Sequence, residues 1–574
     1  MRKISWAVLV ATASLLLGPH LLGNVFTIAN GDVAGLKNAI AASNINGEDD
    51  TIELATNGTY TITARDNSIN GLPRIQLDGG HQLTIHGNGS TIQRSTAGGT
   101  LKFRIFYINS GANVAISGLI LANGNITALA GSYGGGIYSD GESGTVNLSI
   151  TDCTFNSNFA DYGGALYNDG ESGLAAPSVL VVANSTFTGN GANYAGAIFN
   201  DGAFGSAMLN VNNCTFSGNS ASISSGSIQH DAFMGSATGS FINCTFDHNT
   251  ATQYGGAVGT DGDSGSVTLT VKNCTFNGNS AGTSGGGIDN SGGGAILQVA
   301  NTIFKTGANG ANLSNEAGTI TSQGHNLSND NGAGFLTAAG DKINTDPMLD
   351  PAGLVNNGGP TQTIALQAGS MAIDAGNDAN APERDQRYYQ RNGVSDIGAF
   401  EFGGTLAPTT AGSGKTHGAA GSFTINFPLT GTVGVECRTS GAGGSHQLVM
   451  PFATPVTVGG ASVTSGIGSV SSFVVNGSSV TVNLTGIANA QQIAVTLSNV
   501  NDGTHTNNVI IPMRFLLGDT TGNSSVNASD VTQGKQGVGQ ALTNANFRRD
   551  VNANGTINAT DVTIIKAQVG MAIP

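Results

Sequence analysis

Two short segments near the C-terminal end of the chain carry oxygen-bearing side chains at the same offsets. They begin at Asp519 and Asp550, 31 residues apart, and the twelfth residue of each is again an aspartate. A twelve-residue loop with oxygen donors at alternate positions, and a branched apolar residue at its eighth, can wrap around one Ca²⁺. We therefore predict two calcium sites, one made by Asp519, Thr521, Asn523, Ser525 and Asp530 and one by Asp550, Asn552, Asn554, Thr556 and Asp561.

The first of these loops departs from the pattern. Thr521 offers a hydroxyl where a carboxylate or amide is usual, and Ser524 stands at the position of the turn glycine. Glycines at 534, 537 and 539 are expected to weaken the helix that follows. The first loop is therefore expected to bind calcium more weakly than the second. The alternative is a pair of Asn/Asp-rich turns that hold no metal.

The C-terminal segment 518–574 resembles a type I dockerin. Each loop is followed by a predicted helix, with Lys535 and Lys566 five residues after the last aspartate. The resemblance implies calcium-dependent docking to a cohesin module, and so membership of a protein complex or of the cell surface. In that family the residues at offsets 10 and 11 help choose the partner, and here they are Ala528, Ser529, Ala559 and Thr560.

The part of the chain that precedes the dockerin-like segment is dominated by a repeat of about 30 residues between Tyr133 and Gly292. One unit is Gly-rich and follows an aromatic or small residue, as in Tyr-Gly-Gly-Ala-Leu at 162–166. The other unit is Cys-Thr-Phe-x-x-Asn, with phenylalanines at 155, 187, 216, 246, 276 and 304. Short alternating strands with Gly-rich corners at a fixed period predict the coils of a parallel β-helix. The segment from Val25 to Ile62, with a predicted helix over 32–42, is expected to cap its first coil.

Repetition also explains several residues that could be mistaken for chemistry. The cysteines of the repeat share one position and are expected to be free thiols in a core ladder: Cys153, Cys214, Cys244 and Cys274. The repeated asparagines are expected to form a hydrogen-bonded ladder: Asn158, Asn190, Asn219, Asn249 and Asn279.

A row of aspartates is the best catalytic candidate in the repeats: Asp140, Asp169, Asp201, Asp231 and Asp261. Stacked coils would bring neighbouring carboxylates to about 4.8 Å, close to the separation in a retaining glycosidase. However, five equivalent acids single out no pair, and Asp-Gly is common in turns, so turn structure or weak cation binding is the preferred interpretation. His230 departs from the pattern beside Asp231 and would be the first residue to mutate if activity were found.

The paired units of 133–310 resemble the repeat of chlamydial-type polymorphic outer-membrane proteins, which implies a right-handed parallel β-helix and a surface or secreted setting. Residues 346–403 resemble a choice-of-anchor Q region, which implies a last β-helix segment followed by an attachment module. Its charged residues are expected to form a structural ion-pair and turn network: Asp374, Arg384, Asp385, Arg387 and Asp396.

The predicted architecture is mainly β. It comprises a signal peptide (1–23), a right-handed parallel β-helix with its N-terminal cap (24–345), a choice-of-anchor Q-like β-helix segment (346–403), a linker (404–418), a β-sandwich (419–517) and a small α-helical calcium-loop domain (518–574). The basic start at Arg2 and Lys3 and the apolar run that follows indicate export, and no later apolar run is long enough to span a membrane.

The net charge of −15 argues against nucleic acid and anionic membranes as partners and is compatible with cations. Two functions stay open. The first is a non-catalytic, adhesin-like surface protein attached to a complex or cell surface through the dockerin-like domain. The alternative is a glycoside hydrolase or lyase of a cellulosome-like system, which would bind and degrade a polysaccharide. The scarcity of basic residues on the central coils counts against a lyase.

Overall fold

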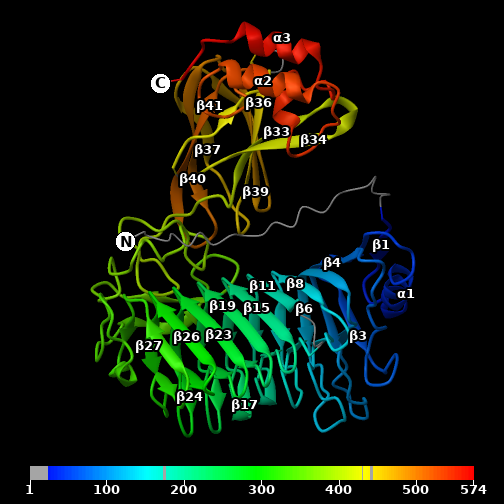
Figure 1. The fold of residues 1–574 in the computed structure, drawn as a ribbon, viewed down its shortest axis with the longest axis vertical. Helices are drawn as coiled ribbons and strands as arrows, with labels where there is room; N and C mark the ends of the chain where they lie inside the picture. Colours follow the sequence, from blue (N-terminus) through cyan, green and yellow to red (C-terminus); the bar gives the residue numbers. More distant parts are fainter. Residues whose placement is uncertain (1–22, 172–175, 430, 440–443, 574) are drawn as a thin grey trace.

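The computed structural model describes residues 23–171, 176–429, 431–439 and 444–573. The predicted signal peptide therefore lies outside the described residues, except for Gly23. A long solenoid forms one layer of the molecule, and a β-sandwich topped by two short helices stands on its side (Figure 1). Among the described residues, no helix has both the length and the apolar character needed to span a membrane.

The N-terminal cap is a strand–helix–strand unit, as predicted. It contains β1 (Val25–Ile28), α1 (Val33–Ser43), β2 (Asp50–Leu54) and β3 (Thr59–Ile62). The Asp32 carboxylate caps α1 by accepting the Gly35 N–H. Leu36 and Ile40, four residues apart on one helical face, are fully buried against the first coil. The helix thus covers the end of the stack, where β1 and β2 pair in parallel.

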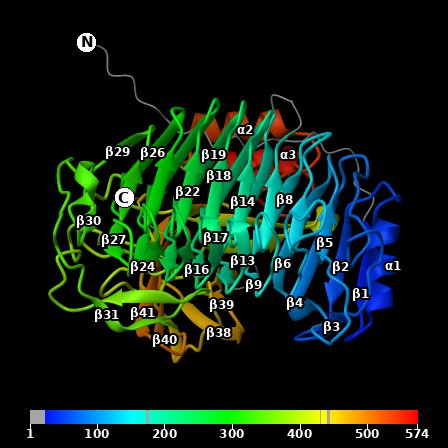
Figure 2. The ribbon, with the colours of Figure 1, turned by 90° about the horizontal axis from the view of Figure 1, so that it is seen from below.

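The solenoid is a parallel β-helix whose strands stack in rows (Figure 2). The first row is β4 (Gln82–Arg94), β6 (Asn113–Ala122), β8 (Asn147–Thr151), β11 (Ser178–Ala183), β15 (Ser206–Asn212), β19 (Ser236–Ile242), β23 (Ser266–Lys272), β26 (Ala295–Ala300) and β29 (Thr319–Ser322). The second is β9 (Thr154–Asn156), β12 (Thr186–Thr188), β16 (Thr215–Ser217), β20 (Thr245–Asp247), β24 (Thr275–Ala281), β27 (Ile303–Thr306) and β30 (Leu327–Ser328). The third is β5 (Phe106–Ile108), β7 (Ile137–Ser139), β10 (Leu166–Asp169), β14 (Ile198–Asp201), β18 (Ile228–Asp231), β22 (Val258–Asp261), β25 (Ile288–Ser291) and β28 (Leu313–Asn315). A shorter row of β13 (Gly191–Tyr194), β17 (Ser220–Ser224) and β21 (Thr250–Ala251) lies between the second and third, and a 3₁₀ turn, η1 (Gly332–Gly334), follows the last coil.

The interior of the solenoid is a set of ladders, because identical residues fall above one another in parallel register. Neighbouring phenylalanine rings of the repeat stack with centroids 4.6 to 5.2 Å apart along Phe155, Phe187, Phe216, Phe246, Phe276 and Phe304. The cysteines are buried and free, as predicted, and burial raises the pKa of the Cys153 thiol to about 12. The asparagines form the predicted ladder: from Asn158 to Asn249, each Nδ2 donates both to the Oδ1 of the next asparagine and to a backbone carbonyl, and the Nδ2 of Asn279 donates to the Phe246 carbonyl.

The segment 346–403 differs from the β-helix continuation that we expected. It contains one antiparallel pair, β31 (Leu349–Val355) and β32 (Thr363–Leu366), and otherwise turns. Rather than adding coils, it runs back along the solenoid: Thr215 donates to the Gln362 carbonyl and Gly398 donates to the Asn301 carbonyl. The segment lacks the Cys-Thr-Phe-x-x-Asn unit whose phenylalanines stack inside the coils from Phe155 to Phe304, so it does not continue that stack.

The sandwich has two sheets that share one hydrophobic core. One sheet has the order β34 (Ser422–Phe427), β33 (Ala411–Thr416), β36 (His446–Pro451), β39 (Ser479–Thr485) and β38 (Ser469–Asn476), and the other has β35 (Val435–Glu436), β41 (Thr506–Phe515), β40 (Gln491–Asn501) and β37 (Gly460–Ser465). A 3₁₀ turn, η2 (Gly418–Ala420), links β33 to β34. The linker prediction for 404–418 is wrong over 411–416, because β33 pairs on both sides within the first sheet. Its small side chains resemble a linker in composition, but Ala411 and Ser413 are buried.

The C-terminal domain contains α2 (Ala528–Gly537), η3 (Phe547–Arg549) and α3 (Ala559–Ala567). Gly534 and Gly537, two of the glycines that we expected to weaken the first helix, lie within α2 and are buried. A Cβ on Gly534 would come within 2.7 Å of Ile565 of α3, so this glycine permits close packing of the two helices.

Candidate functional site

The aspartate row on the third solenoid row is a ladder of turns. Asp169, Asp201, Asp231 and Asp261 are in parallel register. One carboxylate oxygen of each, and of Asp140 in the preceding coil, accepts the backbone N–H two residues further on. This side-chain turn contact confirms the turn interpretation and accounts for the repeated Asp-Gly pair without a catalytic role.

The tyrosine hydroxyls extend this network in the early coils, where Tyr107, Tyr138 and Tyr167 donate to the aspartates of the following coil. Burial raises the pKa of Asp169 to about 7. Burial, reinforced by repulsion from Asp201, likewise raises the pKa of Asp231 to about 7. The carboxyls of Asp169 and Asp231 can therefore hold a proton near neutral pH.

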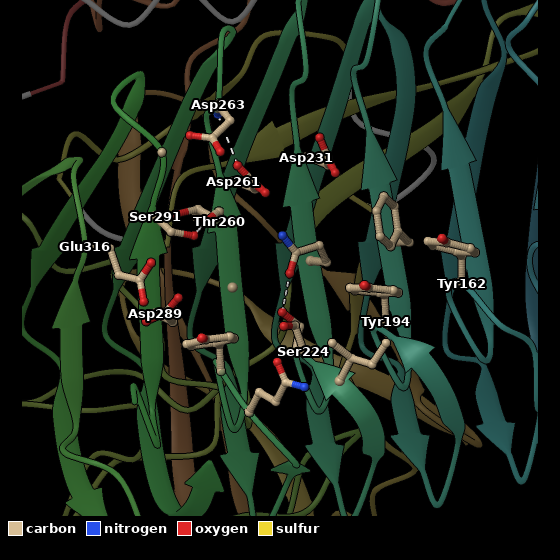
Figure 3. Close-up of a pocket in the computed structure, with 18 of the residues that line it drawn as sticks. Tyr162, Tyr194, Ser224, Asp231, Thr260, Asp261, Asp263, Asp289, Ser291 and Glu316 are labelled. Carbon is tan, nitrogen blue, oxygen red and sulfur yellow. Dashed lines mark hydrogen bonds between the residues drawn. The ribbon is translucent and has the colours of Figure 1, made fainter. Parts of the chain in front are cut away.

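A cavity of about 600 Å³ opens beside the aspartate row, over the coils that contain β14, β18, β22 and β25 (Figure 3). Its walls combine aromatic and acidic side chains, among them Tyr162, Tyr194, Tyr254, Phe199, Asp231, Asp261, Asp263, Asp289 and Glu316. Amides and hydroxyls complete the lining at Ser224, Gln229, Gln253, Thr260 and Ser291. Only two of these residues, Asp231 and Asp261, were candidate site residues in the prediction from sequence. The signal for the cavity was the serine at 224, which lies between copies of the repeat that begin with Tyr194 and Tyr254.

His230 does not face this cavity, so its selection as the first residue to test for catalysis is wrong. Its side chain is fully buried inside the solenoid, where Nδ1 lies 3.2 Å from the Asn200 amide nitrogen. Burial lowers the pKa of His230 to about 3, so the imidazole is neutral. It occupies the space above Gly239, which stands where the neighbouring coils have Leu209 and Leu269. The histidine is therefore a core residue that compensates for a missing side chain.

The charged residues of 374–401 form the structural network that we expected. Asp385 makes two charge-assisted hydrogen bonds to Arg387, and both side chains are buried. The Arg387 guanidinium also lies 3.6 Å from the Phe400 ring centroid. Asp396 accepts the backbone N–H groups of Asp374 and Phe402, and Arg384 donates to the carbonyl of Pro408. These contacts tie the solenoid flank to the start of the sandwich.

The two predicted calcium loops have nearly the same internal geometry. In each, the first aspartate accepts the N–H of the sixth residue: Ser524 N to Asp519 Oδ2 is 2.7 Å and Gly555 N to Asp550 Oδ2 is 2.9 Å. The twelfth residues, Asp530 and Asp561, accept the N–H of the ninth and complete a capping box at the start of α2 and α3. The four carboxylates are thus buried and aimed inward in both copies.

The donor chemistry of both loops fits a hard cation. Burial, with repulsion from Asp550 adding to it, raises the pKa of Asp561, as expected for two carboxylates that face one site. In the first loop the Thr521 hydroxyl donates to both Asp519 and Asp530, so a neutral donor lies between the two acids. Amide and hydroxyl oxygens at Asn523, Ser525, Asn552, Asn554 and Thr556 complete the two predicted donor sets. Among the described residues, no group of three or more His, Cys, Asp or Glu side chains gathers around one point, because each loop supplies only two acids.

Comparison with known protein families decides the nature of this domain. Residues 517–570 match the dockerin type I domain. A second match, at residues 152–169, is to the repeat of the Chlamydia polymorphic membrane protein. No curated protein matches the chain. The resemblance of 346–403 to a choice-of-anchor Q region stays a prediction.

The dockerin region implies tethering to a cohesin-containing complex and indicates an extracellular or cell-surface setting. The four positions that help choose the partner in dockerins, here Ala528, Ser529, Ala559 and Thr560, are all exposed, as are Lys535 and Lys566. Both helices lie on the side of the domain away from the solenoid (Figure 1). The surface that the resemblance assigns to a partner is therefore accessible.

The opposite side of the dockerin region is packed against the sandwich. His417 is buried and its Nδ1 lies 2.9 Å from Asp550 Oδ2, while its Nε2 lies 3.1 Å from an Arg438 nitrogen. Phe423 of the sandwich stacks on Phe547, with ring centroids 5.2 Å apart. The sandwich thus contacts the first aspartate of the second loop, and the outer faces of the two helices stay exposed. This contact was not predicted, because nothing in the spacing of His417 relates it to a loop 133 residues away.

Proposed function

We propose that this chain is an exported, adhesin-like β-helix protein, attached to a complex or cell surface by calcium-dependent docking of its C-terminal domain. The observation that carries the proposal is the arrangement of the dockerin region. Both oxygen-donor loops are formed, one side of the domain is fixed to the sandwich, and the helices with the partner-choosing positions are exposed. In this reading the sandwich is a rigid spacer and the solenoid is the surface presented to the environment.

A second candidate is an enzyme that degrades a polysaccharide. The observation in its favour is that Asp231, with a pKa of about 7, lies one coil from Asp261 on the wall of an open cavity. Two neighbouring carboxylic acids, one of which can hold a proton near neutral pH, are the kind of pair that a glycosidase uses. Against it, both carboxylates are engaged in the same turn contact as the rest of the row. We therefore favour the non-catalytic function.

Calcium binding tests the docking mechanism. Calorimetry on the mature chain should show calcium binding. The double variant D550A/D561A should lose the tighter of the two binding events, which we assign to the second loop. The variant D346A is a matched control, because the Asp346 side chain is largely exposed and distant in sequence from both loops. Absence of a calcium-binding heat in the wild type would refute the docking mechanism.

Cohesin binding tests the partner. In a panel of immobilised type I cohesin modules, we expect at least one to retain the wild type in calcium and release it in EDTA. Because Ala528 and Ala559 are exposed on the two helices, the double variant A528D/A559D should lose this retention while still binding calcium. A substitution at the exposed sandwich residue Gln447, Q447D, should leave retention unchanged. Retention of A528D/A559D at the wild-type level would show that the partner uses another surface.

Activity assays decide between the two candidates. The mature chain should release no reducing ends or unsaturated products from pectin, alginate or xylan. Clear turnover that is abolished in D231N and D261N would establish the enzymatic function instead.

A further inference from the structure

The cavity on the solenoid arises where a ladder of tyrosines is interrupted. Tyr133, Tyr162 and Tyr194 lie one above another through parallel bridges, with neighbouring ring centroids 5.6 and 5.2 Å apart. The next coil has Ser224 at this position, and the coil after it has Tyr254. One aromatic layer is therefore missing between Tyr194 and Tyr254.

A second aromatic ladder ends in the same coil. Tyr107, Tyr138, Tyr167 and Phe199 follow one another in register along the third row, with ring centroids 5.1 to 5.6 Å apart. The following coils have Gln229, Gly259 and Asp289 at this position. The space at Gly259 is bounded by Ser225 and Gln229, whose side chains a Cβ on the glycine would meet at 2.2 and 2.6 Å. The two interruptions together produce the hollow of about 600 Å³.

The dimensions of the gap fit one six-membered ring. Adjacent coils are separated by about 4.8 Å, so the backbones at Tyr194 and Tyr254 lie about 10 Å apart across the Ser224 coil. A ring placed midway would lie about 5 Å from each aromatic residue, within the range at which rings pack face to face. Ile223 adds an apolar contact on the wall of the cavity.

The polar lining defines the chemistry of the occupant. Asp231, Asp261, Asp289 and Glu316 supply carboxylates, and Gln229 and Gln253 supply amides. The described residues that line the cavity include no lysine, arginine or histidine. Uronic acids, sulfated sugars and phosphates would meet only negative charge, whereas hydroxyl and amino groups would find hydrogen-bond acceptors.

We propose that this cavity, between Tyr194 and Tyr254, binds one pyranose unit of a saccharide that carries hydroxyl or amino groups and no acid group. The aromatic residues contact the faces of the ring and the carboxylates and amides accept its O–H or N–H groups. The site needs no catalytic step and does not depend on the docking function proposed above. The solenoid would then be the part that recognises a glycan, while the C-terminal domain provides attachment.

Binding of defined oligosaccharides to the mature chain tests the site. Oligomers of glucose, xylose, glucosamine and galacturonic acid are titrated in a calorimeter, in EDTA so that the calcium loops and docking do not contribute. We expect at least one of the first three to bind and the galacturonic acid oligomer not to bind. Failure of all three, or equal binding of the acidic oligomer, overturns the proposal.

Three variants locate the binding. S224Y restores the missing layer and should abolish binding. Y254S removes one wall and should weaken binding about tenfold, roughly the effect of one lost aromatic contact; it is expected to fold, because serine occupies the same position at 224 and 284. S284Y is the matched control, since Ser284 lies on the same ladder but does not line the cavity, and should bind as the wild type does. Unchanged binding by both S224Y and Y254S would place the saccharide elsewhere and refute the assignment.

Discussion

The asparagine ladder offers the sharpest quantitative test of how the solenoid is held together. Replacement of Asn219 by alanine removes four hydrogen bonds. Its Oδ1 accepts from the backbone N–H and the side-chain amide of Asn190 at 3.0 and 2.9 Å. Its Nδ2 donates to the Phe187 carbonyl and to Asn249 Oδ1, both at 2.9 Å.

The expected cost follows from the burial of every partner. Asn190, Asn219, Asn249 and Phe187 are all fully buried, so no water replaces the lost contacts. At about 1 to 1.5 kcal/mol for each buried hydrogen bond, N219A should destabilise the solenoid by roughly 4 to 6 kcal/mol. A loss this large is rare for a single substitution and places Asn219 among the most important residues of the repeat.

Equilibrium unfolding in urea, followed by circular dichroism and by hydrogen exchange of the central coils, provides the measurement. The matched control is N193A, because the Asn193 side chain is exposed in the same part of the repeat and accepts a single hydrogen bond, from the Ser222 hydroxyl. The control should change stability by less than about 0.5 kcal/mol. If N219A and N193A shift the transition equally, the ladder does not carry the stability that we assign to it.

Three further predictions concern other parts of the chain. Ser524 has φ of 69°, in the left-handed region, and its Oγ accepts a hydrogen bond from Arg514. S524G and S524A both lose this bond, but only glycine relieves the backbone, so S524G should be more stable than S524A by about 1 kcal/mol, seen as a higher Tm of the C-terminal domain. Equal Tm values would show that the first predicted calcium loop is not strained. R387M should destabilise the region that joins solenoid and sandwich by about 3 to 5 kcal/mol, because Asp385 would stay buried without its cation. Unfolding in guanidinium chloride measures this loss, and a variant as stable as the wild type would contradict the prediction. Because burial raises the pKa of Asp169 to about 7, the native state binds a proton that the unfolded state has lost, so the wild type should lose stability as pH rises from about 4 to 7. D169N should remove that part of the slope and the exposed control D263N should keep it; parallel pH profiles for wild type and D169N would refute the assignment.

The sequence alone determined the local chemistry and the periodic parts of this protein. The period of about 30 residues fixed a stacked solenoid, because a coil with a constant length places like residues above one another. From that stacking followed the free cysteines, the asparagine ladder and the turn role of the aspartates, all of which the structure confirms. The offsets within the two C-terminal loops are likewise local, so the two donor sets could be predicted without a fold and stay predictions.

Only the tertiary structure decided the features that join distant segments. The course of 346–403 along the solenoid, the strand over 411–416 and the contact between His417 and Asp550 depend on packing between parts that have no common period. The two glycines of α2 were expected to weaken that helix, and only the structure shows that a side chain at Gly534 would meet Ile565 and one at Gly537 would meet Arg549 and Ile557. His230 was selected as a candidate site residue because it departs from the repeat pattern. Its side chain instead fills the interior space left by Gly239, which stands where the neighbouring coil has Leu209. The cavity needed both ladders to be interrupted in the same coil, and only the register of the stacked strands shows that they are.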